Sequence, residues 1–145
     1  MYLQFNDDQR QLYEAVRDFC INEIAPKAAD RDANHRFEDG LIQKLSAMGL
    51  YGTYIPAEYG GSGLDIVSYI MTVEELSRAC GATGILVSAH HSLCCDPIIH
   101  FGTEAQKQKY LPKLATGEWI GCFSLTEPGS GSDAGSARCM AVETK

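Results

Sequence analysis

The stretch GCFSLTEPGSGSDAG, residues 121–135, lies where the pattern of the sequence changes. Residues 119–125 are rich in β-compatible side chains and are followed by a run of Pro, Gly, Ser and Asp, so we expect a strand and then a loop. A further strand is expected over residues 137–143. Upstream, apolar residues recur at helical spacing. Helices followed by strands indicate a mainly α chain, in which a helical domain is joined to the first strands of a β domain.

The first helical segments are marked by capping and stop signals. Asn6 and Gln9 can form a capping box, and the helix that they start is expected to end before Pro26. A second helix is predicted over residues 41–48, with Asp39 as its cap.

A third helix is predicted after Asp65, which can cap it, and it follows the Pro- and Gly-rich loop 55–63. Its expected apolar face consists of Ile66, Ile70, Val73 and Leu76, and its expected polar face of Glu74, Glu75 and Arg78. Residues 83–93 carry few polar side chains, which predicts a central, buried helix. A short helix over residues 96–102 and a helix that begins with a capping box at residues 103–106 complete the series.

The composition is that of a folded protein with a packed core. Apolar residues make up 45% and charged residues 21% of the 145 residues. The net charge of -7 gives no electrostatic basis for binding nucleic acid or an anionic lipid surface. No apolar run approaches the roughly 18 residues that span a bilayer, so integral membrane association is not expected. The six cysteines form no C-x-x-C pair, which is typical of a reducing compartment.

Residues 123–133, FSLTEPGSGSD, carry a hydrophobic residue, then Thr-Glu-Pro, then Gly-Ser-Asp at fixed spacing. This segment resembles a motif of the acyl-CoA dehydrogenase family, with a match at every fixed position. The upstream stretches RDFCINEIAP, IPAEYGGSGLD, VEELSRA and FGTEAQKQKYLPKLATGE resemble the same family. GATGILVSAHHSL and GCFSLTEP are most similar to its short-chain, butyryl-CoA-preferring branch. The resemblance therefore covers essentially the whole chain.

This resemblance implies two domains. Residues 1–117 would form the N-terminal all-α domain of the family, and residues 118–145 would begin its middle β-barrel domain, which is incomplete. The catalytic base of the family is a carboxylate of a C-terminal helical domain that these residues do not include. No catalytic residue is therefore expected in this chain, and a structural role is expected for Glu127. We interpret the sequence as a truncated portion of the enzyme.

The resemblance also implies cofactor-binding and substrate-binding positions. The positions implied for FAD are Phe123, Ser124, Leu125, Thr126, Gly131 and Ser132. The Thr126 hydroxyl would lie near the N5 edge of the flavin, where a hydrogen bond stabilises charge that arrives on the ring. Phe123 and Leu125 are the apolar side chains that would cover the ring. Ser132 would also contact the acyl-CoA.

The implied reaction is the FAD-dependent α,β-dehydrogenation of a short-chain acyl-CoA to a trans-2-enoyl-CoA, in fatty-acid or amino-acid catabolism. An electron-transferring flavoprotein would reoxidise the flavin, and full-length members are usually homotetramers. The location would be the mitochondrial matrix in a eukaryote, although no transit peptide is visible, or the cytoplasm in a bacterium. The alternative is an inactive, truncated helical module that binds a partner. The sequence ends inside an expected strand and would leave that strand without neighbours, which favours a fragment of the enzyme over the binding module.

Other kinds of site fit these residues less well. Residues 126–135 also have the composition of a surface turn, but the upstream matches weigh against it. They provide neither the dinucleotide fingerprint nor the Gly-Lys-Ser/Thr of a P-loop. His90 with Cys94 and His91 with Cys95 are i,i+4 pairs. Because adjacent pairs point about 100° apart around a helix, no metal site is expected there, and a buried core or pocket wall is favoured.

Overall fold

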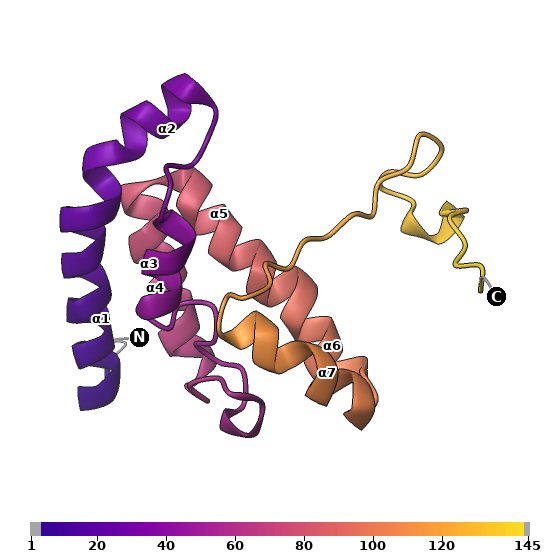
Figure 1. Cartoon of the computed structure of the whole chain (residues 1–145), viewed down its shortest axis with the longest axis horizontal. Coiled ribbons are helices and arrows are strands. Elements are labelled where there is room, and N and C mark those ends of the chain that lie inside the picture. The colour runs from indigo at the N-terminus through magenta and orange to yellow at the C-terminus, as the bar shows by residue number, and fades with distance from the viewer. Residues whose placement is uncertain (1–3, 144–145) are drawn as a thin grey trace.

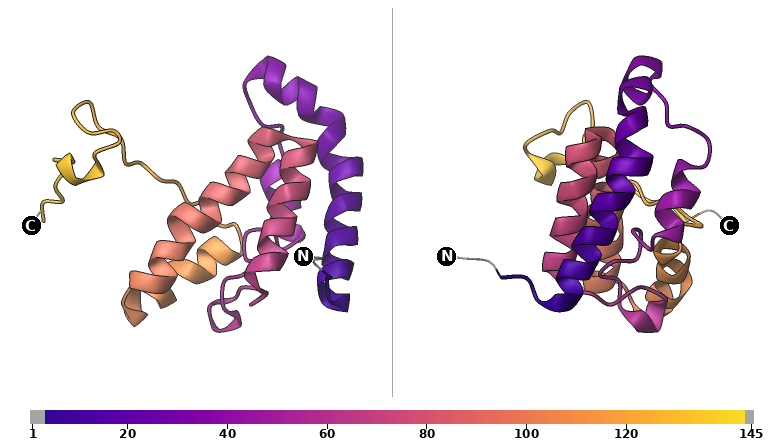
Figure 2. Two further views of the ribbon diagram at one scale, coloured as in Figure 1. Left: turned by 180° about the vertical axis from the view of Figure 1, so that it is seen from behind. Right: turned by 90° about the vertical axis from the view of Figure 1, so that its left-hand side faces the viewer.

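The computed structural model describes residues 4–143 and consists of a helical body from which the C-terminal segment extends (Figure 1). The described residues form seven α-helices: α1 (Asp7–Phe19), α2 (Ala28–Asn34), α3 (Leu41–Ala47), α4 (Ile66–Ala79), α5 (Gly81–Ala89), α6 (Asp96–Phe101) and α7 (Glu104–Ala115). Helix α4 lies between α1 and α5 (Figure 2). The expected mainly α body is therefore confirmed.

A continuous helical run leads from α1 to α2 past Pro26, so the expected end before this proline is wrong. The N-terminal capping box is confirmed, because the Asn6 side chain accepts a hydrogen bond from the Gln9 amide at 2.8 Å. A π-helical turn, Cys20–Ile24, and a 3-10 turn, Ala25–Lys27, join the two helices. The wider π turn changes the spacing of the carbonyls before the proline, which allows the run to continue although proline lacks an N–H.

The other predicted caps have mixed outcomes. Asp65 caps α4 as expected: one oxygen accepts from the Ser68 amide and the other from the Gln9 side chain, both at 2.8 Å. The capping box at residues 103–106 is present at the start of α7. Asp39 does not cap α3, because Gly40 occupies the N-cap position with a positive φ of 87° and provides no side-chain oxygen.

Two clusters of buried side chains form the core. The larger joins α1, α3, α4 and α5, and it contains Val16, Cys20, Ile24, Leu41, Leu45, Leu50, Tyr51, Leu76, Cys80 and Val87. The smaller lies under α7 and contains Ile55, Tyr59, Cys95, Leu111, Leu114 and Ala115. Each fully buried aliphatic side chain contributes about 1.5 to 3 kcal/mol relative to exposure.

The predicted faces of α4 are right for Leu76, which is buried, and for Glu74 and Arg78, which are exposed, but wrong for three other residues. Ile66 and Ile70 are both 55% exposed, whereas Glu75 is buried. The buried residues of α4 are Ser68, Tyr69, Met71, Thr72, Glu75 and Leu76. Because α4 packs against α1 on one side and α5 on the other, small and polar side chains face its neighbours. These polar groups find local partners: the Thr72 hydroxyl donates to the Ser68 carbonyl at 2.9 Å.

The expected strands over residues 119–125 and 137–143 do not form within the described part of the chain. Its residues after 117 contain one isolated bridge, between Glu127 and Ser130, and one 3-10 turn, Ala134–Ser136. A strand needs a neighbouring strand to pair its N–H and C=O groups, and these residues meet none. The segment therefore runs away from the body as an extended chain (Figure 1).

Candidate functional site

A second π turn lies in the helical run from α5 to α6. The two helices that were expected over residues 83–93 and 96–102 belong to one run, in which the π turn His90–Cys95 joins α5 to α6. The predicted start of α6 at Asp96–Pro97 and its end before Gly102 are confirmed. Both histidines of this turn are fully buried. In a π turn, residues five apart come together, and the Cys95 sulfur lies 3.4 Å from Nε2 of His90. The expected pairing of residues four apart, His90 with Cys94 and His91 with Cys95, is therefore wrong, because the observed pair is His90 with Cys95.

His90 fixes the start of the extended segment. The Gly121 amide donates a hydrogen bond to Nδ1 of His90 at 3.0 Å. Because Nδ1 accepts, the imidazole must be neutral with its proton on Nε2. Burial lowers the pKa of His90 and keeps this form dominant at neutral pH. A Cβ on residue 121 would lie 2.5 Å from Cβ of Cys94, so only glycine fits this contact.

His91 forms part of the wall behind this contact. Its Nε2 lies 2.9 Å from the Leu50 carbonyl, which can only accept, so Nε2 carries the proton. The ring stacks on Tyr54 and packs against Tyr69, with centroids 4.9 and 5.0 Å away. Burial lowers the pKa of His91 to about 4. The favoured interpretation of residues 90–95 as a buried wall is confirmed for both histidines.

Glu127 folds the loop that follows the extended segment. Its carboxylate accepts hydrogen bonds from the amides of Arg138 and Cys139, both at 2.8 Å. These bonds lower the pKa of Glu127 and hold it ionised. Its backbone also pairs with Ser130 in both directions. The expected structural role of this carboxylate is therefore confirmed, and the loop is fixed by its own hydrogen bonds.

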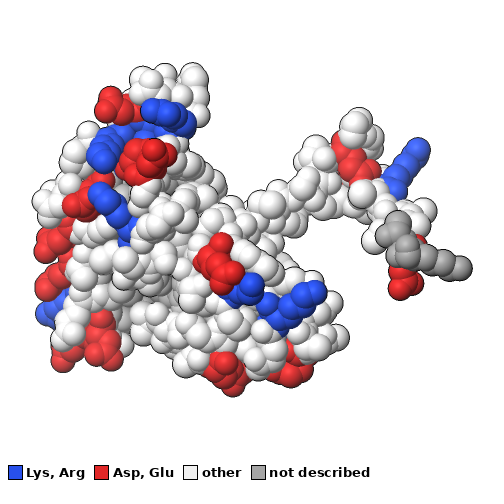
Figure 3. Space-filling model, in the orientation of Figure 1, with Lys and Arg blue, Asp and Glu red and all other residues white. Residues whose placement is uncertain are grey.

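The six residues predicted to contact FAD lie along this segment and loop. Phe123 and Leu125 are 51% and 46% exposed, and Ser124, Thr126, Gly131 and Ser132 are exposed too. The bridge between Glu127 and Ser130 places the ends of the loop, Thr126 and Gly131, on either side of one short turn. Residues 119–126 carry no charged side chain, and Figure 3 shows this uncharged stretch between the body and the charged loop.

This donor set fits a flavin in its chemistry. Extended backbone with free amides and carbonyls suits the polar edge of a planar ring, and exposed apolar side chains suit its face. A hydroxyl at Thr126 and a loop backbone without Cβ atoms at Gly129 and Gly131 allow close approach of a ligand. These groups can form only one side of a site, since no other part of residues 4–143 covers them and they are exposed to solvent.

Two other kinds of feature are missing from residues 4–143. No group of three or more His, Cys, Asp or Glu side chains is arranged to hold a metal ion. No helix there is long and apolar enough to cross a membrane.

Residues 6–118 match the family profile described as "Acyl-CoA dehydrogenase, N-terminal domain". The chain belongs to the acyl-CoA dehydrogenase family. It is 47% identical, over 93% of its length, to "Acyl-CoA dehydrogenase, short-chain specific" of Clostridium acetobutylicum. It spans 36% of the length of that relative.

Solved structures of the family have the same fold over the same region. Butyryl-CoA dehydrogenase from Megasphaera elsdenii superposes with a TM-score of 0.88 at 40% identity, over 95% of this chain and 37% of that one. An acyl-CoA dehydrogenase from Bacillus anthracis, complexed with FAD, superposes with a TM-score of 0.85 at 42% identity, over 92% of this chain and 23% of that one. Members of this dehydrogenase family thus bind FAD.

Sequence reasoning missed the contact between His90 and Gly121. The two residues are 31 positions apart and belong to no motif that pairs them. The one available signal was Gly121, a glycine inside the otherwise β-compatible run 119–125, where a residue with a side chain would normally be preferred.

Proposed function

We propose that this chain provides the N-terminal part of an FAD-dependent enzyme that oxidises short-chain acyl-CoA thioesters to trans-2-enoyl-CoA. Membership of the acyl-CoA dehydrogenase family supports the reaction class, and identity of 47% to a short-chain-specific relative supports the substrate class. The chain spans about a third of that relative, so the activity belongs to a longer assembly of domains. The observation that carries the proposal is the exposed segment 123–132, which follows directly on the contact of Gly121 with the helical body.

In this proposal the residues of the segment divide the work. Phe123 and Leu125 cover the flavin ring, and the backbone of Ser124 meets its polar edge. The Thr126 hydroxyl donates to that edge, where negative charge develops when the bound FAD accepts the β-hydride of the substrate. Gly131 and Ser132 contact FAD through the loop backbone, and Ser132 also contacts the acyl-CoA.

The proposal includes the two domains expected from the sequence. Residues 1–117 form the all-α domain, and residues 118–145 begin a β domain whose strands form when neighbouring strands are supplied. The base that removes the α-proton comes from a part of the enzyme outside these residues. The expected partners are an electron-transferring flavoprotein and further copies of the subunit in a homotetramer. The expected location is the mitochondrial matrix or the bacterial cytoplasm.

A chimera tests this function. Residues 1–145 replace the aligned third of the Clostridium acetobutylicum short-chain enzyme, and the purified chimera is assayed with butyryl-CoA and an artificial electron acceptor. We expect bound FAD and reduction of the acceptor that depends on butyryl-CoA. A chimera that folds and retains FAD but does not oxidise butyryl-CoA would contradict the substrate class. One that folds without FAD would contradict the cofactor assignment.

A further inference from the structure

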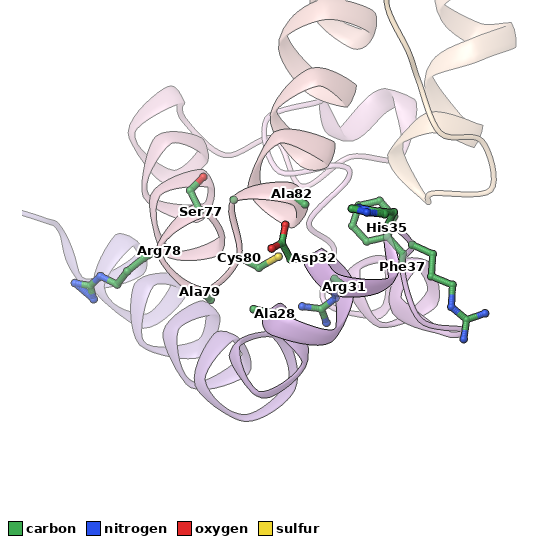
Figure 4. A pocket seen from close by; sticks show the side chains of 12 residues that line it. Ala28, Arg31, Asp32, His35, Phe37, Ser77, Arg78, Ala79, Cys80 and Ala82 are labelled. Carbon is green, nitrogen blue, oxygen red and sulfur yellow. The ribbon is translucent and has the colours of Figure 1, made fainter.

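An open cavity of about 640 Å³ lies between α2 and the junction of α4 with α5 (Figure 4). In Figure 1 this end of α2 lies on the opposite side of the helical body from the segment proposed to bind FAD. Cys80, the residue that separates α4 from α5, lines this cavity together with Arg31 of α2. The other charged or titratable side chains around it are Asp32, His35, Arg36 and Arg78. Arg78 points outward at the rim (Figure 4).

The surroundings of the Cys80 sulfur favour its anionic form. Cys80 is the N-cap residue of the nine-residue helix α5, where the helix dipole favours negative charge. The Thr83 hydroxyl, in the first turn, is fully buried beside the sulfur and has no hydrogen-bond partner among residues 4–143. A thiol is a weak acceptor, whereas a thiolate accepts strongly. Ionisation of Cys80 would therefore give this orphan donor a partner.

Arg31 adds a fixed positive charge. It donates to the Ile24 carbonyl at 2.7 Å and to the Glu38 carboxylate at 2.6 Å, so its guanidinium is held in place beside Cys80. Burial raises the pKa of the Cys80 thiol, but the donors on Thr83 and Arg31 outweigh burial, and the pKa is lowered overall.

Other buried cysteines behave in the opposite way. Burial raises the pKa of Cys20 to about 11 and that of Cys95 to about 12, and no positive charge beside either thiol offsets it. Cys80 thus combines a stabilised thiolate with a position in the wall of an open cavity, where 8% of the residue is exposed. A lowered pKa and access from solvent are the two requirements for a reactive cysteine.

We propose that Cys80 is a site of thiol–disulfide exchange with small anionic disulfides, represented by oxidised glutathione. The Cys80 thiol gives its proton to solvent, and the thiolate attacks one sulfur of the disulfide. The new bond joins the Cys80 sulfur to that half of the reagent, the original S–S bond breaks, and the second half leaves with the electron pair as a thiolate. The cavity is lined by three arginines, Arg31, Arg36 and Arg78, and by one carboxylate, Asp32. Glu75 pairs with Arg78, but the excess of arginines in the lining still favours an anionic reagent over a cationic one.

The test uses the full chain with oxidised glutathione, and with cystamine as a cationic disulfide. Remaining thiols are blocked, and adducts are located by peptide mass spectrometry from pH 6 to 9. We expect a glutathione adduct at Cys80 at pH 7, absent from Cys80→Ser, with a rate that levels off at lower pH than the rate at exposed Cys139. We also expect the ratio of Cys80 to Cys139 adducts to be higher for glutathione than for cystamine. An equal ratio would overturn the anionic preference.

Thr83→Val supplies the matched variant, because it keeps the shape and removes the hydroxyl. We expect several-fold slower modification of Cys80 at pH 7 and an unchanged rate at Cys139, with circular dichroism reporting on the fold. If the variant unfolds, the pH profile of Cys80 modification in the parent chain still tests whether Cys80 is a reactive site. A Cys80 that stays unmodified at pH 7, or that follows the same pH profile as Cys139, would overturn the site. Neither result depends on dehydrogenase activity.

Discussion

At the scale of single residues, two adjacent histidines hold backbone groups in opposite ways. Nδ1 of His90 accepts from the Gly121 amide, whereas Nε2 of His91 donates to the Leu50 carbonyl. The role of His90 requires a neutral ring, because Nδ1 accepts. A proton on Nδ1 of His91 would have no partner, since this atom meets no acceptor among the described residues. A proton added to either ring would be buried and uncompensated. The pair therefore makes the stability of the helical body sensitive to acid.

His91→Gln should reduce this sensitivity. In the unfolded chain His91 takes up a proton near its ordinary pKa of 6.5, whereas in the folded chain its pKa is about 4. Below pH 6.5 the unfolded state thus binds more protons, and the free energy of unfolding falls as the pH falls. His91 alone contributes about 2 kcal/mol to this fall between pH 7 and pH 5.

Urea unfolding at several pH values measures the effect of His91→Gln. Glutamine can still donate to Leu50 but does not titrate, so its curve should be flatter by about that amount. Parallel curves for the parent and His91→Gln would show that His91 does not titrate differently in the two states.

Thr126→Ala tests the flavin contact at the same scale, in the chimera described above. The exposed hydroxyl makes no hydrogen bond among the described residues, so its loss should leave the thermal unfolding temperature unchanged. A hydrogen bond to a charged group contributes about 1.5 to 3 kcal/mol, which corresponds to about ten- to a hundredfold slower flavin reduction by butyryl-CoA. Stopped-flow bleaching of the flavin band reports this step. Equal reduction rates and FAD affinities would remove Thr126 from the site.

At the scale of elements, two prolines explain why helix ends were harder to predict than helix starts. Capping boxes at residues 6–9 and 103–106 are local, and the sequence predicted both. Pro26 was read as the end of a helix and Pro97, correctly, as the start of one, but each comes just after a π turn inside a continuous helical run. Whether a proline ends a helix or is accommodated depends on packing of the whole run. The exposed Ile66 and Ile70 show the same limit, because neighbours on two sides of α4 override its apolar pattern.

Gly121→Ala should detach the extended segment from the π turn His90–Cys95. The new methyl group would overlap Cβ and the sulfur of Cys94, and the hydrogen bond to His90 would be lost as the backbone shifts. We expect faster amide hydrogen exchange over residues 119–123 and little change in the core of α4. Gly129→Ala is the control, because its Cβ would meet nothing within 4 Å. Equal exchange in the two variants would show that the contact does not hold the segment.

At the scale of the whole molecule, the sequence was enough to predict the family and the helical body. It was not enough to predict how the residues of the candidate site are arranged in space. Residues 123–133 carry the motif, and the chemical role of each can be predicted from its residue type alone. Their arrangement around a ligand depends on groups that are distant in sequence, as the His90 contact shows. The expected strands illustrate the same point, because backbone pairing is a property of two segments and only one is present in the described chain.

The 145-residue chain alone should therefore have no butyryl-CoA dehydrogenase activity. Phe123 and Leu125 are about half exposed, so FAD would meet one wall of a site, and the carboxylates near it are engaged, as Glu127 is with two amides. Without a base to remove the α-proton, hydride transfer would have to generate an unstabilised thioester cation. The assay combines purified chain, excess FAD, butyryl-CoA and an artificial electron acceptor. We expect turnover equal to that of free FAD, while the chimera under the same conditions turns over faster. Activity of the chain above free flavin, abolished by Thr126→Ala, would mean that these residues already contain a working base and a complete flavin site.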